Sequence, residues 1–89
     1  MRAIITVTGK DCVGIIAQVS AACSEVNANI EDITQKVLDD LFVMVMLANI
    51  DDLSIKFTDF VDRMTKLGEQ NGLVIHTMHE EIFNAMHRI

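Results

Sequence analysis

The chain has 89 residues, of which 51% are hydrophobic, and 7 Lys and Arg against 13 Asp and Glu give it a formal net charge of −6. This length predicts a single domain over residues 1–89, since domains contain on the order of 100 to 200 residues. The acidic balance argues against nucleic acid as a direct partner, because that binding depends on clustered cations. The longest strongly apolar stretch, 41–50, is only about half of the roughly 20 residues that a membrane-spanning helix needs, so we expect no membrane insertion.

The two cysteines, Cys12 and Cys23, form neither a CxxC motif nor a disulfide framework, which predicts reduced thiols. Met1 and Arg2 lead directly into a short β-branched run without the apolar segment and cleavage site of a signal peptide. We therefore expect a cytoplasmic protein.

The first strand is predicted over residues 3–8, which are β-branched apart from Ala3 and run into the turn-like residues 9–11. From Gly14 onward the apolar residues recur three and four apart, as an amphipathic helix requires. This helix is expected to end near Asn27, because the sequence Asn-Ala-Asn favours caps and turns.

Two strands are predicted next, over about 30–38 and 41–50. The spacing of Ile30 and Ile33 breaks strict alternation and indicates a bulge, and Asp39 and Asp40 supply a hairpin turn. The second of these strands is apolar on both faces, which suits a strand that is covered on both sides. Two helices cover only one side of a sheet, so this strand is a first indication of a dimer.

The second helix is expected to begin after Asp51 or Asp52, either of which would cap it. Gly72 marks its end, residues 73–78 form a fourth strand, and a short helix follows near the C-terminus. The buried stripe of the second helix would be formed by Leu53, Phe57, Phe60, Val61, Met64 and Leu67.

This order, β-α-β-β-α-β with a tail, predicts an α+β, ferredoxin-like fold, in which two helices pack on one face of a four-stranded antiparallel sheet.

The turn from Thr8 to Gly14 joins a strand to a helix N-terminus and carries glycines near both ends. Backbone N–H groups and the helix dipole attract carboxylates or phosphates at such a place. The turn lacks the P-loop and dinucleotide-binding patterns. From the residues alone, an anion-accepting site and a plain strand-to-helix turn both remain open.

The sequence Val-Thr-Gly-Lys-Asp-Cys-Val-Gly-Ile-Ile-Ala over 7–17 resembles the signature of ACT domains, which are regulatory amino-acid-binding modules. The segment Asn-Ala-Asn-Ile-Glu-Asp-Ile over 27–33 is similar to the helix-to-second-strand segment of that family, and the small size resembles stand-alone single-ACT proteins. The family also includes a repressor of the glycine cleavage system that resembles tandem copies of this unit. Many members have Arg-Pro where this chain has Cys12 and Val13, so the loop here keeps an N–H and lacks the ring that fixes φ.

The resemblance implies a homodimer, often with the sheets joined edge to edge, and a ligand between the first turn of one subunit and a segment of the other. A free amino acid would place its carboxylate on the amides near 13–15 and its ammonium on Asp11 or an Asn oxygen, with Ile15 and Ile30 shaping the side-chain pocket. The implied site residues are Gly9, Lys10, Asp11, Val13, Gly14 and Ile15 in the first segment and Asn27, Asn29 and Ile30 in the second.

Other chemistry has weaker support. Cys12 beside a helix N-terminus suits a redox-sensing thiol, but a small loop side chain is the simpler interpretation, and Cys23 reads as a core residue. His76 and His79 are three apart on a strand and point to opposite faces, so we expect no metal site from them, with or without His87. No catalytic residues and no cofactor are predicted.

We therefore expect a regulatory or sensor module that binds an amino acid or similar metabolite and acts through an unidentified effector protein. The alternative is a purely structural protein–protein interaction domain without a small-molecule ligand. A small ferredoxin-like hydrolase or isomerase that uses Asp11 or His76 is a third hypothesis.

Overall fold

The computed structural model describes residues 1–10 and 13–86. The predicted order is confirmed, and a four-stranded antiparallel sheet runs in the order β2-β3-β1-β4. The elements are β1 (Arg2–Gly9), α1 (Ile15–Glu25), β2 (Asn29–Leu38), β3 (Leu41–Asn49), α2 (Phe57–Gln70), β4 (Val74–His79) and α3 (Glu80–Met86).

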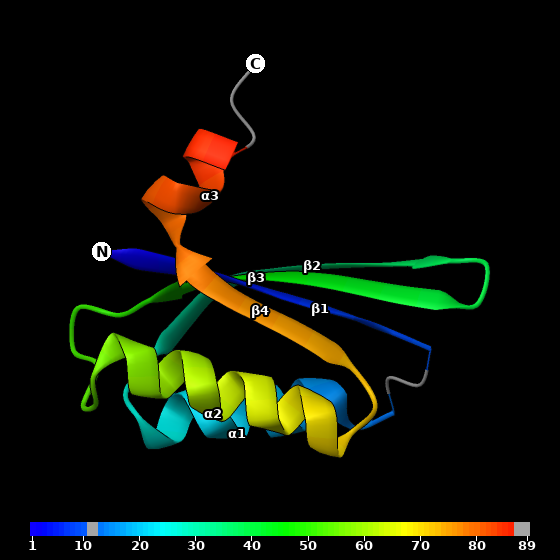
Figure 1. Ribbon diagram of the computed structural model, residues 1–89, viewed down its shortest axis with the longest axis horizontal. Helices are drawn as coiled ribbons and strands as arrows, with labels where there is room; N and C mark the ends of the chain where they lie inside the picture. The colour runs from blue at the N-terminus through cyan, green and yellow to red at the C-terminus, as the bar shows by residue number, and fades with distance from the viewer. Residues whose placement is uncertain (11–12, 87–89) are drawn as a thin grey trace.

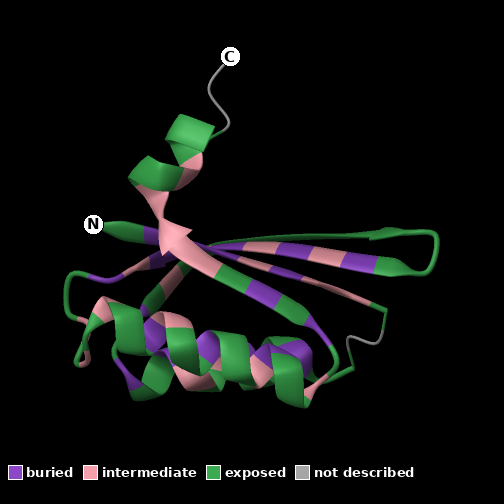
Figure 2. Cartoon of the chain, in the orientation of Figure 1, coloured by how far each residue is buried: buried purple, intermediate pink, exposed green. Residues whose placement is uncertain are grey.

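The two longer helices lie side by side on one face of the sheet, and α3 projects from the opposite face (Figure 1). Because side chains alternate along a strand, one face of β3 carries Phe42, Met44, Met46 and Ala48, all buried against the helices. Its other face carries Val43, Val45 and Leu47, which are only half-buried (Figure 2). We call this second side of the sheet the free face.

The core lies between the sheet and the helices. Ile15, Val19 and Cys23 recur every four residues along α1 and are buried, as are Phe60 and Met64 of α2. Residues at this spacing share one side of a helix, so the predicted stripes are confirmed where they meet the sheet. Ile16, by contrast, is exposed.

Positive φ angles occur where the predicted turns lie. Asn27 adopts φ 61° just after α1, Asp39 adopts φ 58° in the β2–β3 hairpin, and Gly72 adopts φ 67° after α2. Asn, Asp and Gly tolerate this left-handed conformation best. The expected bulge is also present, as a register shift between Ile30 and Asp32.

The predicted cap of the second helix is wrong. The helix begins at Phe57 after Lys56, which makes no side-chain cap. Asp51 instead accepts a hydrogen bond from the N-terminal ammonium of Met1, and its backbone N–H donates to Asn49 Oδ1 at 2.9 Å. Leu53 therefore belongs to the connection that precedes α2, where it packs against the core without being helical.

Candidate functional site

The first predicted segment runs from the end of β1 into α1. Gly9 is the last residue of β1, and Gly14 precedes α1 at φ 75°, ψ −1°, a left-handed conformation. Among the described residues no side chain caps this helix start. The first amides of a helix have no carbonyl partner within it, so the start of α1 offers donors that suit an anion. Asp11 and Cys12 lie outside the described residues.

The two glycines of this segment serve different purposes. A Cβ on Gly9 would lie 2.0 Å from Leu73 Cδ2, so a larger residue would collide with a buried side chain. A Cβ on Gly14 would lie 4.0 Å from Gln18 Nε2, an ordinary contact, so the constraint at Gly14 is its positive φ. Packing explains Gly9 without any ligand, whereas Gly14 shapes a helix start that is open to solvent.

The side chains of this segment point to different surroundings. Lys10 Nζ lies 3.6 Å from Asp40 Oδ2 in the β2–β3 hairpin turn, and both side chains are well exposed. Val13 is exposed, and Ile15 is 1% exposed within the core. The side chain of Ile15 is therefore in the core, and its backbone is the part that belongs to the helix start.

The second predicted segment, Asn27 to Ile30, borders a polar hollow of about 640 Å³ at the other end of α1. Ser20 and Ser24, one helical turn apart, and Asp52 complete its wall beside both asparagines. Hydroxyl, amide and carboxylate oxygens gathered in this way suit an ammonium group. We did not predict Ser20, Ser24 and Asp52 from the sequence; the i, i+4 spacing of the serines ahead of Asn27 is the signal that could have indicated the first two.

The two segments do not meet within one chain. They lie at opposite ends of α1, whose 11 residues span about 16 Å at roughly 1.5 Å per residue. The hollow therefore gathers Asn27, Asn29 and Ile30, while Gly9, Lys10, Val13, Gly14 and Ile15 lie together at the far end. A site made from both would need a second copy of the chain, with its α1 running the other way.

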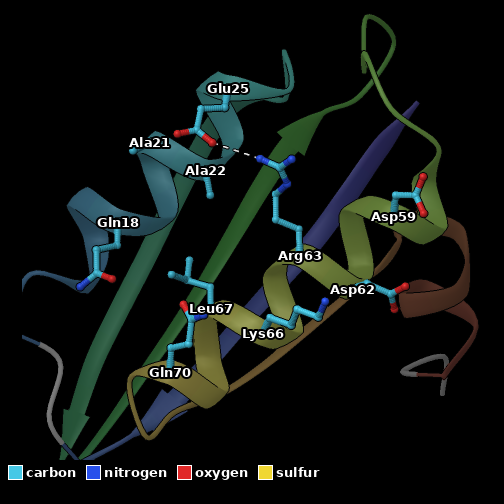
Figure 3. A pocket seen from close by; sticks show the side chains of 10 residues that line it. All are labelled: Gln18, Ala21, Ala22, Glu25, Asp59, Asp62, Arg63, Lys66, Leu67 and Gln70. Atoms are coloured by element: carbon cyan, nitrogen blue, oxygen red, sulfur yellow. Dashed lines mark hydrogen bonds and ion pairs between the residues drawn. The ribbon is translucent and has the colours of Figure 1, made fainter.

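A shallow groove of about 660 Å³ separates α1 and α2 on their outer side (Figure 3). Arg63 of α2 points across it to Glu25 of α1, with Nη1 and Oε2 3.0 Å apart. Asp59, Asp62 and Lys66 also border the groove. These charges are open to water, where ion pairs contribute little to stability or affinity.

The histidines do not converge. The register pairs His76 with Thr6 and His79 with Ala3, so the two rings lie on opposite faces, as predicted. The ring of His79 stacks on that of Phe57, with centroids 3.9 Å apart. Among the described residues no cluster of three potential metal ligands forms, and His87 lies outside that part of the chain.

Cys23 is buried in the core, and burial raises the pKa of its thiol to about 11. A thiol with this pKa is almost wholly protonated at neutral pH, so it is a poor nucleophile. No helix in residues 1–10 and 13–86 is long and apolar enough to span a membrane.

The ACT domain family model matches residues 2–77. A UPF0237 protein of Listeria innocua is 44% identical over 89 residues, covering 100% of both chains. Among solved structures, an ACT domain protein from Streptococcus pneumoniae is 39% identical with a TM-score of 0.82 and covers 98% of each chain. A putative glycine cleavage system transcriptional repressor shares the fold at 22% identity and a TM-score of 0.68, over 89% of this chain and 47% of that one.

Proposed function

The chain belongs to the ACT domain family, whose members are regulatory small-molecule-binding modules, and we propose that it binds a free amino acid at a homodimer interface and acts through a partner protein. The family supports a binding role in preference to a catalytic one. The free thiol of Cys23 suits the cytoplasm as its location.

An exposed edge supports the dimer. Ile33 and Val37 of β2 pair with Met46 and Phe42, so they point to the side of the sheet that carries the helices. Nevertheless they are 37% and 65% exposed, because the helix layer stops short of this edge. A long edge strand with uncovered apolar side chains is a surface that pairs with another chain.

A second copy joined at this edge by a two-fold axis would run antiparallel to the first. Its α1 would then lie alongside this α1 in the opposite direction, bringing the start of one helix to the end of the other. The polar hollow beside Asn27 and Asn29 would thus approach the helix start at Gly14 of the second copy.

The two ends carry complementary groups for an amino acid. The uncapped start of α1 accepts the carboxylate, because its amides donate hydrogen bonds and the helix dipole favours negative charge. The oxygens of Asn29, Ser24 and Asp52 accept hydrogen bonds from the ammonium. Ile30, also at the hollow, contacts the side chain, and Lys10 follows β1 on the way to the carboxylate end. The observation that carries the proposal is the pairing of the helix start at Gly14 with an acceptor-rich hollow at the two ends of one helix.

A thermal-shift screen of the common amino acids at millimolar concentration tests the proposal. A ligand that binds only the folded state raises the melting temperature, because it adds RT ln(1+[L]/Kd) to the free energy of unfolding. At least one amino acid should raise it, and N-acetylation or esterification of that amino acid should remove the effect.

Two variants locate the binding. Gly14→Ala, which strains the helix start, and Asn29→Ala, which removes an acceptor at the hollow, should each weaken binding at least tenfold by calorimetry, a loss of about 1.4 kcal/mol. Asn29 is the better choice than Asn27, whose positive φ makes Ala a strained replacement. Thr58→Ala, on the exposed side of α2, is the control.

If no amino acid stabilises the protein while light scattering still gives a dimer, the sensor proposal fails. The exposed edge of β2 then supports the second candidate, a structural protein–protein interaction domain without a ligand.

A further inference from the structure

The free face of the sheet carries exposed and half-buried apolar side chains. Val43, Val45 and Leu47 form a continuous apolar line along β3, and Leu41 extends it with 40% of its surface exposed. On β4, Val74 of the same face is 53% exposed. A contiguous apolar surface of this kind, with polar residues around it, is typical of an interface.

One pair of opposite charges on this face, both on β2, is placed symmetrically, whereas Arg2, which pairs with Glu80 and Glu31, lies at one end of the face. The register gives three successive rows across β2 and β3: Asp32 beside Leu47, Thr34 beside Val45, and Lys36 beside Val43. Asp32 and Lys36 lie in the two rows that flank the Thr34–Val45 row. A two-fold axis that lies in the interface along the Thr34–Val45 row reverses the strand direction, so the strands of the two copies run antiparallel. It would place Asp32 of each copy opposite Lys36 of the other, and Leu47 opposite Val43.

We propose that the free face binds the free face of a second copy of this chain, about a two-fold axis through Val45. The packing is isologous, since the same patch serves both partners. It uses a different surface from the β2 edge of the proposed amino-acid site, so the two interfaces together give four copies.

The area of the face explains why α3 takes part. Four strands spaced about 4.8 Å apart, with seven residues rising about 3.4 Å each, cover roughly 450 Å². A stable interface buries about 800 Å² per partner. The flat extent of the sheet is thus smaller than the accessible area that a stable interface buries, and a further element of each copy would enlarge the contact.

The helix α3 is that element. It rises from the free-face side of the sheet at the end where β1 begins (Figure 1), and none of its residues is buried. Ile82 and Met86 are 52% and 66% exposed. Ile82 also lines a hollow of about 500 Å³ between α3 and the N-terminus. Under the same axis, α3 of each copy meets the opposite end of its partner's face, where Leu41 and Val74 are exposed.

Charge reversal tests the proposed pairing. In Asp32→Lys, lysines face lysines at two symmetry-related places, and in Lys36→Asp, aspartates face aspartates, so each variant should halve the mass measured by sedimentation velocity. The double variant Asp32→Lys/Lys36→Asp exchanges the charges and should restore the wild-type mass. Single variants that keep the wild-type mass, or a double variant that fails to recover it, would overturn the proposal.

Because Asp32 and Lys36 lie on β2, the strand of the other proposed interface, Val45→Lys on β3 separates the two interfaces: it places like charges face to face on the axis and leaves β2 unchanged. If both interfaces exist, the mass falls from four copies to two, whereas without the β2-edge dimer it falls from two copies to one. Amino-acid binding should persist in every charge variant that still forms the edge dimer.

Cross-linking checks the position of the axis. In a Cys12→Ser background, Val45→Cys should give a covalent dimer with a short bis-maleimide, because the two side chains face each other across the axis. Thr58→Cys, on the outer side of α2, should not. Ile82→Ser/Met86→Ser should lower the yield of the Val45→Cys dimer at least fivefold, and an unchanged yield would remove α3 from the interface.

Discussion

Gln18 and Asn71 exchange two hydrogen bonds: Gln18 Nε2 donates to Asn71 Oδ1 at 3.2 Å, and Asn71 Nδ2 donates to Gln18 Oε1 at 3.1 Å. Asn71 Nδ2 also donates to the carbonyl of Leu67 at 2.8 Å. The pair joins the second turn of α1 to the end of α2, beside the helix start at Gly14. It therefore connects the N-terminal part of α1 to the C-terminal end of α2.

Replacement of either amide should loosen this connection. We expect Gln18→Ala and Asn71→Ala each to lower the free energy of unfolding by about 0.5 to 1.5 kcal/mol, the usual contribution of a side-chain hydrogen bond. In a double-mutant cycle by urea denaturation the two effects should not add. Gln70→Ala, an exposed neighbour, is the control, and strictly additive losses would contradict the link.

Gly9→Ala should destabilise the fold by about 1 to 3 kcal/mol, because the added Cβ collides with Leu73. In a Leu73→Ala background this cost should shrink. The cost of Gly72→Ala should not change in that background, since its cause is a positive φ with open space around it. Equal costs of Gly9→Ala in both backgrounds, measured by denaturant unfolding, would show that the collision is not the cause.

The thiol of Cys23 should resist modification. In Cys12→Ser protein at pH 8, we expect Ellman's reagent to label the native state far more slowly than the urea-unfolded state, because the folded thiol has a pKa of about 11 and is buried. The unfolded thiol ionises near pH 8.5, so stability due to this group is lost as pH rises from about 8.5 toward 11. Equal labelling rates in the two states would exclude this burial.

Acid should weaken two ion pairs at the ends of the chain. Hydrogen bonding from Arg2 lowers the pKa of Glu80, with Nε to Oε2 at 2.5 Å and Nη2 to Oε1 at 2.6 Å, and the N-terminal ammonium lowers the pKa of Asp51. Carboxylates whose pKa is lower in the folded state stabilise it above their unfolded pKa, near 4, and lose that effect as pH falls further. The melting temperature should therefore drop below about pH 4.5.

Comparison of variants isolates the contribution of Glu80. Glu80→Gln should show a shallower fall of melting temperature with acid than the wild type. Glu69→Gln, which changes a carboxylate on α2, should follow the wild-type curve. Identical curves for Glu80→Gln and the wild type would show that the Arg2 pair adds no acid sensitivity.

Thr77 Oγ1 is a buried oxygen without a hydrogen-bond partner among the described residues. Thr77→Val replaces the hydroxyl with a methyl group of similar shape, so it should raise the free energy of unfolding by about 1 kcal/mol. Thr65→Val is the matched control, since the hydroxyl of Thr65 donates to Val61 O at 2.9 Å and its loss should not stabilise the protein. A destabilised Thr77→Val protein would mean that this hydroxyl has a partner.

Local sequence patterns determined most of the elements. The β-branched run of β1, the spacing of Ile15, Val19 and Cys23, and the broken alternation at Ile30 each depend on residues a few positions apart. Asn27, Asp39 and Gly72 marked turns because their own backbones tolerate positive φ. The candidate site residues came instead from the resemblance to ACT domains, and the structure places the two segments at opposite ends of one helix.

Contacts between distant residues decided the rest. Asp51 does not cap α2, which begins only at Phe57, and its carboxylate instead binds the N-terminal ammonium, 50 residues away. Gly9 is required by Leu73, and the polar hollow gains Asp52 from the loop before α2. A local sequence pattern specifies whether a segment forms a helix or a strand and which side it buries, since propensity and periodicity depend on residues only a few positions apart. Which carboxylate meets which cation, and which face of the sheet is left bare, depends on the packing of elements that the pattern does not relate to one another.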